Sequence, residues 1–159
     1  MARSCFIEDM AKAPPYTKVH KNLFIGSKRA LTAPDADFDV YISAAEEIKP
    51  PRSIMDAFDA YHIPLKDKPW EFEQHPEELQ RLVITAHDIA VLVKHGNRVL
   101  IFCHMGMNRS GLMAALTLMN LGYTAKQAVA AIRKRHGCAL SNSSFVRALS
   151  YAERMIRRS

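Results

Sequence analysis

The chain has 159 residues, of which 48% are hydrophobic and 24% charged, and its formal net charge is +6. This length predicts one domain that buries a hydrophobic core, and the apolar stretches are too short to span a membrane. The excess of Lys and Arg favours an anionic partner, a class that includes phosphate esters, nucleic acid and lipid surfaces.

The first half of the chain predicts an irregular arm followed by three strands. We expect the arm over residues 1–17 and a single domain over residues 18–159. The arm is acidic in part and has no long apolar run, which argues against a secretory signal, so we expect a cytoplasmic protein. The alternating or β-branched segments 19–27, 38–45 and 60–65 predict strands, with room for one or two helical turns over residues 50–59.

The second half predicts four helices and one buried strand. Pro76 suits the first turn of a helix and Gly96 lies where a helix-ending glycine is expected, so we predict a helix over residues 76–94. The segment RVLIF, residues 98–102, is continuously apolar after Arg98, which is typical of a strand covered on both faces. Further helices are predicted over 109–120, over 124–136 with a capping box from Thr124 and Gln127, and after a cap at Ser141 or Asn142. A central strand that leads into a helix indicates an α/β fold.

The segment from Cys103 to Arg109 connects the last predicted strand to a helix and is the candidate for chemistry. Backbone N–H groups of such a loop converge on an anion at the helix N-terminus, and Gly106 lets the backbone bend there. A thiol in this position, near a guanidinium, is favoured as the thiolate, and Arg109 can hold two oxygens of a phosphoryl group. Ser110 adds a hydroxyl that suits the departure of the thiolate as a leaving group. These features predict attack on phosphorus by Cys103 without a metal or another cofactor.

The stretch CHMGMNRSG, residues 103–111, resembles the Cys-x5-Arg-Ser/Thr signature of the cysteine-dependent protein tyrosine phosphatases, most closely the dual-specificity branch. KNLFIGS, FDVYISAAEE and NSSF are similar, in the same order, to other segments of that branch, so the resemblance covers most of the chain from about residue 18 onward. It implies an α/β fold with a central, mostly parallel sheet of four or five strands flanked by helices. It also implies catalytic roles for Cys103, Arg109 and Ser110, and a loop that binds the substrate phosphate, formed by Cys103, His104, Met105, Gly106, Met107, Asn108 and Arg109.

The same resemblance implies a general acid on a loop between a strand and the long helix. HIPLKDKPW places Asp67 at that point, followed by Trp70, which is positioned to cover the loop. Glu71 and Glu73 are alternatives, as is a solvated carboxylate without a catalytic role. One departure concerns Phe102, which stands where the family usually has a histidine that helps to order the loop. We expect the phenylalanine to fill the space but to leave the thiolate less stabilised.

The leading hypothesis is therefore a metal-independent phosphatase that acts on phosphotyrosine, and also on phosphoserine or phosphothreonine, of a phosphorylated protein. An RNA 5′-phosphatase is an alternative, because GMNRSG also resembles the loop of the cysteine-dependent RNA triphosphatases and the positive charge suits RNA. A phosphoinositide phosphatase is another, although His104 is the only basic residue between Cys103 and Arg109. A phosphate-binding protein without enzymatic activity is an alternative from a different class. The retention of the whole loop argues against it. The sequence has no Cys-x-x-Cys and no second cluster of potential ligands, so it does not predict a metal site.

Overall fold

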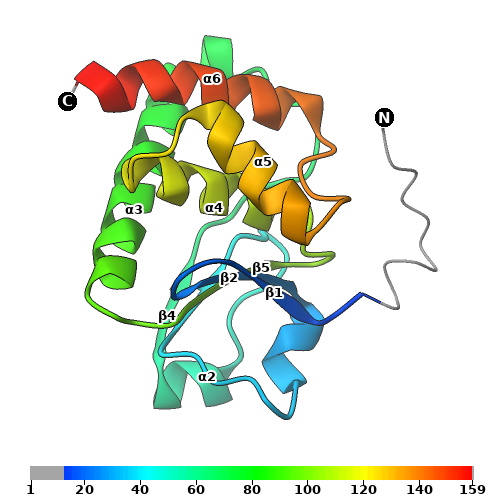
Figure 1. Ribbon diagram of the computed structural model, residues 1–159. Helices are drawn as coiled ribbons and strands as arrows, with labels where there is room; N and C mark the ends of the chain where they lie inside the picture. The colour runs from blue at the N-terminus through cyan, green and yellow to red at the C-terminus, as the bar shows by residue number, and fades with distance from the viewer. Residues whose placement is uncertain (1–12, 159) are drawn as a thin grey trace.

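A five-stranded sheet forms the centre of the computed structural model, which describes residues 13–158 (Figure 1). Its strands lie in the order β1-β2-β5-β3-β4, and only β1 and β2 pair antiparallel. Their bounds are β1 Tyr16–His20, β2 Leu23–Ser27, β3 Val40–Ser43, β4 Asp59–His62 and β5 Val99–Cys103. The predicted α/β class with a mostly parallel sheet is confirmed.

The first two strands form a hairpin where one strand was expected. The segment 19–27 is interrupted at Asn22, which has a positive φ of 67°, a conformation that asparagine tolerates better than most residues. The chain turns there, so β1 pairs with β2 at the edge of the sheet. Strand β1 begins at Tyr16 and therefore includes the last two residues of the arm that was expected to be irregular. Residues 1–12 of that arm lie outside the described residues.

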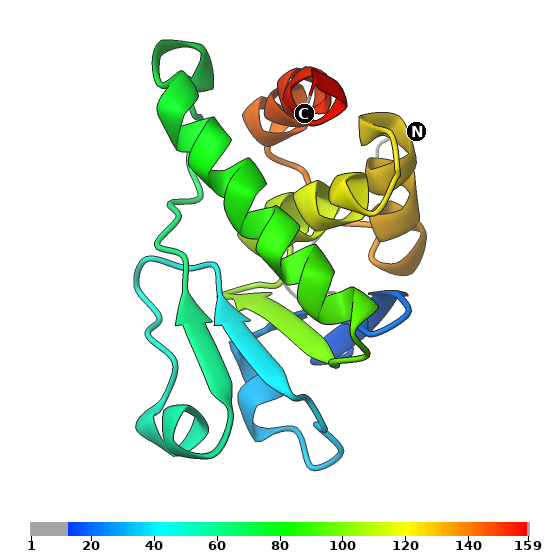
Figure 2. The same cartoon turned by 90° about the vertical axis from the view of Figure 1, so that its left-hand side faces the viewer.

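Four helices cover one face of the sheet, and shorter elements cover the other (Figures 1 and 2). The four are α3 Pro76–Lys94, α4 Arg109–Asn120, α5 Ala125–Arg135 and α6 Ser143–Arg158. The opposite face carries the 3-10 helix η1 Lys28–Thr32 and helix α2 Arg52–Ala57, while the 3-10 helix η2 Phe72–Gln74 precedes α3. None of the described helices is both long enough and apolar enough to cross a membrane.

Local signals explain why the helices begin and end where predicted. Helices α3 and α4 have the predicted bounds, and Gly96 after α3 has a φ of 89°, as expected of a helix-ending glycine. The capping box of α5 is present, because Thr124 Oγ1 accepts from the Gln127 N–H at 3.1 Å and Gln127 Oε1 accepts from the Thr124 N–H at 2.9 Å. These contacts satisfy backbone donors that the first turn of a helix otherwise leaves unpaired.

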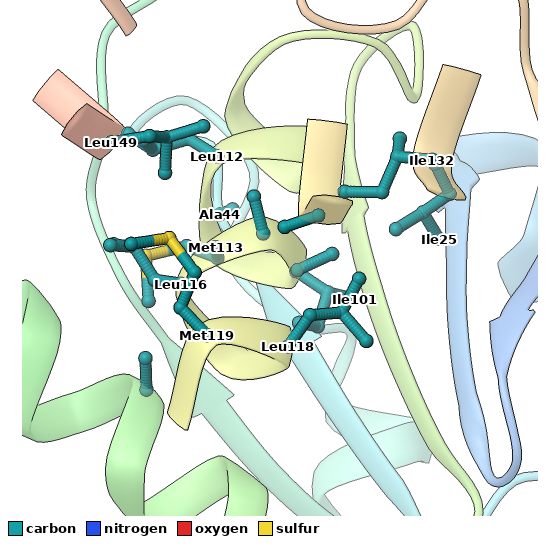
Figure 3. Close-up of a cluster of buried hydrophobic side chains, with 14 of the residues drawn as sticks. Ile25, Ala44, Ile101, Leu112, Met113, Leu116, Leu118, Met119, Ile132 and Leu149 are labelled. Carbon is teal, nitrogen blue, oxygen red and sulfur yellow. The ribbon is translucent and has the colours of Figure 1, made fainter. Parts of the chain in front are cut away.

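Helix α4 is the centre of the core and the element that anchors the loop before it. Its residues from Arg109 to Met119 are all buried, between the sheet and the helices α3, α5 and α6. Figure 3 shows Leu112 and Leu116 among the side chains that α4 contributes, together with Ile101 from β5 and Leu149 from α6. Truncation of such a leucine costs about 2–5 kcal/mol, so this packing gives the first turn of α4 a rigid position.

A second, smaller apolar cluster lies on the opposite face of the sheet. It contains Phe102, fully buried, with Phe24, Phe38, Tyr41 and Leu100. Because successive side chains of a strand point to opposite faces, Phe102 faces this cluster while its neighbours on either side in β5 face α4. The residue in the usual histidine position is thus part of the apolar core.

Candidate active site

The loop that connects β5 to α4 lies at the carboxyl end of the central strand. Strand β5 is flanked by β2 and β3, both parallel to it, and Cys103 is its last residue. Ligand sites of open parallel sheets lie at this end of the strands, where the loops to the following helices begin. The topology therefore puts Cys103 and the N-terminus of α4 where an anion is expected to bind.

Gly106 is required by the conformation of this loop. Its φ is 73°, and a Cβ atom there would lie 2.8 Å from both Gly26 C and Ser27 N. The carbonyl of His104, two residues before Gly106, accepts a hydrogen bond from the Lys28 N–H at 3.5 Å. The loop thus packs closely against the end of β2. This close contact is a second reason why residue 106 is glycine, besides the bend of the backbone predicted from the sequence.

The thiol of Cys103 lies beside the hydroxyl of Ser110. Cys103 is 2% exposed, Ser110 is fully buried, and Sγ is 3.4 Å from Ser110 Oγ, within hydrogen-bonding distance for sulfur. The structure thus brings these two predicted residues together. A hydroxyl at this distance can donate to a thiolate that leaves phosphorus.

Arg109 is buried and is held by Glu47, a residue that the sequence analysis did not single out. Arg109 Nη1 donates to Glu47 Oε2 at 2.6 Å and Nη2 donates to Oε1 at 2.7 Å, while Nη1 also donates to the Leu65 carbonyl at 3.2 Å. Hydrogen bonds from the guanidinium lower the pKa of Glu47 to about 2. The available signal was an acidic pair that follows the buried strand β3 after two alanines, and β3 neighbours β5.

The pairing with Glu47 leaves one edge of the guanidinium without a hydrogen-bond partner among the described residues. Of its five N–H groups, the two on Nη1 and one on Nη2 are used by Glu47 and Leu65. The N–H of Nε is buried and has no hydrogen-bond partner among the described residues. Nε and the second N–H of Nη2 lie on the same edge, and this pair is a bidentate donor suited to two phosphoryl oxygens.

Asp67 lies against the same loop through Asn108. Asn108 Nδ2 donates to Asp67 Oδ2 at 3.1 Å, and Asn142 Nδ2 donates to Asp67 Oδ1 at 3.3 Å. Asn108 Oδ1 in turn accepts from the Asn142 N–H at 2.9 Å and from Ser141 Oγ at 3.2 Å. Of the alternatives, Glu73 pairs instead with Arg147 of α6 at 3.7 Å. Asp67 therefore contacts the loop, whereas Glu73 faces α6.

The segment after Asp67 is attached to the start of α6. Asn142 Nδ2 donates to the Lys68 carbonyl at 2.9 Å, and the Trp70 N–H donates to Ser144 Oγ at 2.9 Å. The Trp70 ring packs against the rings of Phe72 and Phe145. The sequence placed Trp70 as a cover for the loop but did not predict that residues 142–144 would hold it.

The remaining loop residues form the rim. His104 and Met105 are exposed, Met107 is half-buried, and the Met107 carbonyl accepts from the Leu140 N–H at 3.1 Å. Within residues 13–158, His, Cys, Asp and Glu side chains form no group that could hold a metal ion. The loop is ordered by Asn108, Leu140 and Lys28, and Phe102 contributes an apolar ring to the cluster beneath it.

The chain belongs to a known family. Residues 23–155 match the family model described as the dual specificity phosphatase, catalytic domain, so the chain is a dual-specificity phosphatase by family. It is accordingly a protein phosphatase of the protein-tyrosine and dual-specificity class. A comparison with curated protein sequences found no significant match.

Several solved structures share the fold of this chain. The crystal structure of human DUSP28 matches with a TM-score of 0.78 at 23% identity, over 91% of this chain and 97% of that one. A mouse putative dual specificity phosphatase complexed with zinc tungstate matches with a TM-score of 0.76 at 24% identity, over 92% of this chain and 91% of that one. The structure of DUSP15 matches with a TM-score of 0.72 at 20% identity, over 90% and 92%. At these identities the likeness concerns the fold.

Proposed function

We propose that this phosphatase hydrolyses phosphotyrosine, and also phosphoserine and phosphothreonine, through a cysteinyl-phosphate intermediate and without a metal. The observation that carries the proposal is the unpaired edge of the buried Arg109 guanidinium in the loop that begins at Cys103. A buried N–H without a partner costs free energy, and a bound phosphoryl group would satisfy it.

In the first step Cys103 Sγ attacks phosphorus as the bond between phosphorus and the leaving oxygen breaks. Arg109 and the backbone N–H groups of the loop hold the other phosphoryl oxygens, on which negative charge is spread. Asp67 donates its proton to the leaving tyrosine or serine oxygen, so the product departs as a neutral hydroxyl. The products of this step are the dephosphorylated residue and phosphocysteine.

In the second step water attacks the phosphorus of phosphocysteine. Asp67, now a carboxylate, accepts a proton from that water, and the bond between sulfur and phosphorus breaks. Ser110 Oγ, 3.4 Å from Sγ, donates a hydrogen bond to the thiolate as it leaves. Inorganic phosphate departs and the free thiolate is restored.

The acceptance of phosphoserine and phosphothreonine rests on the rim. The chain has no long insertion around the loop, and the residues that stand at the mouth, His104 and Met105, are exposed. A shallow mouth admits a short phosphorylated side chain as well as tyrosine.

A substrate panel with two variants tests the proposal. The enzyme should hydrolyse phosphotyrosine, phosphoserine and phosphothreonine peptides faster than phosphoinositides or 5′-triphosphorylated RNA, and EDTA should not change the rates. Cys103→Ser should abolish turnover but retain phosphopeptide binding, and Arg109→Lys should be severely impaired because a point charge does not reproduce the bidentate fork. Faster turnover of triphosphorylated RNA, which needs less protonation of its leaving group and thus less of Asp67, would make the protein an RNA 5′-phosphatase.

A further inference from the structure

A pocket of about 160 Å³ adjoins the outer side of the phosphate-binding loop. One of its walls is the loop itself, and the opposite wall is the turn between β2 and η1, which touches the loop at Gly106. The residues of the pocket used below are Lys28, Arg29, His104, Met105, Gly106 and His136. This volume exceeds the about 10–15 Å³ of cavity that one water needs and leaves room for a carboxylate or phosphate group.

The pocket is positively charged. None of the described residues that line it is acidic, and Lys28 and Arg29 form no ion pair with a carboxylate of residues 13–158. Arg29 Nη1 is directed to the Ala13 carbonyl at 3.0 Å, while Lys28 makes no side-chain hydrogen bond to the described residues. Burial lowers the pKa of His136, which disfavours its charged form, whereas Lys28 and Arg29 are positively charged at neutral pH.

We propose that this pocket binds an acidic side chain, a carboxylate or a second phosphate, that flanks the phosphorylated residue of a peptide substrate. The inference rests on the proposed protein phosphatase activity and assigns it a substrate class. Lys28 and Arg29 supply the charge complementarity, and the shared loop supplies the proximity.

The distances fit a peptide better than a polyphosphate. Consecutive Cα atoms are about 3.8 Å apart, so the Cα of Met105 lies within about 7.6 Å of that of Cys103. In an extended peptide, residues two apart point to the same side and are separated by about 7 Å. A flanking side chain can therefore cross the rim while the phosphorylated residue occupies the loop. The phosphates of a 5′-triphosphate share single oxygens, so the second one would stay inside the same loop.

The test compares three phosphotyrosine peptides that differ only two residues before and after the phosphotyrosine, with Gln, Glu or phosphoserine at both positions. At low salt the enzyme should prefer the Glu and phosphoserine peptides over the Gln peptide by about two- to fivefold in kcat/KM, the range expected for exposed charge pairs. Lys28→Ala should lower this preference to less than twofold, and about 0.5 M NaCl should lower it in the unmodified enzyme. A preference for phosphoserine alone would identify a second phosphate as the ligand, and an equal preference a general anion site.

The matched control is Lys94→Ala. Lys94 is an exposed lysine at the end of α3, next to the start of β5 and therefore at the end of the sheet opposite to the loop. This variant should retain the preference. Binding of the same peptides to Cys103→Ser gives a second readout that does not depend on turnover.

The possible failures are distinguishable. Equal turnover of all three peptides, or the same preference in Lys28→Ala as in the unmodified enzyme, would overturn the inference and leave the proposed function intact. Absence of both turnover and binding of every phosphopeptide would overturn both. A Lys28-dependent preference for 5′-triphosphorylated RNA over the peptides would replace the peptide by RNA as the occupant.

Discussion

Replacement of Glu47 by Gln is the sharpest test of how the site is built, because it removes one charge and almost no volume. The pKa of Glu47 falls from 4.5 to about 2 through its hydrogen bonds with Arg109. At about 1.4 kcal/mol per pKa unit this corresponds to at most about 3 kcal/mol of stability. The Glu47 side chain is 48% exposed, so solvent screening reduces this figure to about 1–2 kcal/mol.

The dependence on pH has a definite sign. A carboxyl group whose pKa is lowered in the folded state contributes stability above its unfolded pKa and loses it as the pH falls through the folded value. The unmodified protein should therefore exceed Glu47→Gln in stability by about 1–2 kcal/mol at pH 7, and the difference should shrink between about pH 5 and pH 2. Urea unfolding across this range measures it.

The same variant should reduce activity, because Glu47 sets which edge of the guanidinium faces the loop. We expect kcat/KM for a phosphotyrosine peptide to fall by about tenfold or more, since a misplaced donor weakens the stabilisation of transition-state charge. Glu46→Gln is the matched control, because Glu46 makes an exposed pair with Lys66 at 3.8 Å and does not contact Arg109. Equal behaviour of the two variants in stability and in kcat/KM would refute the positioning role of Glu47.

Three further predictions test the acid, the residue before the cysteine and the loop glycine. Asp67→Asn should lower kcat on phosphopeptides by about 10²–10⁴-fold and remove the basic limb of the pH profile, with a smaller loss on p-nitrophenyl phosphate; an equal loss on both substrates would reject Asp67 as the acid. Phe102→His should lower the free energy of unfolding by about 2 kcal/mol or more, because it places ring nitrogens in the apolar cluster, whereas Phe102→Leu should cost less. A stable histidine variant whose acidic limb of kcat/KM moves to lower pH would instead show that the lack of a histidine weakens the stabilisation of the thiolate. Gly106→Ala should cost more stability than Gly96→Ala. Both glycines have a positive φ, but only at Gly106 would the added carbon lie 2.8 Å from backbone atoms. Equal costs in thermal melts would show that the contact with Gly26 and Ser27 is unimportant.

Features that depend on near neighbours in the chain were predictable. Helix α3 has its predicted bounds because Pro76 and Gly96 are local signals, and the loop between Cys103 and Arg109 was recognisable from its place between a buried strand and a helix. The hairpin of β1 and β2 was missed because the strand pattern of residues 19–27 continues across the turn at Asn22, where only the backbone conformation marks the reversal.

Features that depend on distant residues were not predictable from one sequence. Glu47 and Arg109 are 62 positions apart, and nothing local to Glu47 distinguishes it from its neighbour Glu46, which faces a surface lysine. The surroundings of Phe102 also depend on distant residues. The alternation of β5 directs its ring to the face of the sheet that carries Phe24, Phe38 and Tyr41, where it fills an apolar space. A weaker stabilisation of the thiolate stays a prediction.

Asn108 joins the parts of the site that come from the most distant segments. Its side chain donates to Asp67 and accepts from the backbone of Asn142. The phosphate-binding loop, the segment 67–70 and the start of α6 therefore meet at one amide. Four hydrogen bonds hold the segment 67–70 there: from Asn108 and Asn142 to Asp67, from Asn142 to Lys68 and from Trp70 to Ser144. At about 0.5–1.5 kcal/mol each, they amount to about 2–6 kcal/mol. This is enough to hold Asp67 against the loop before substrate binds. We therefore expect the start of α6 to influence the reaction through the position of Asp67, without contact with the phosphate.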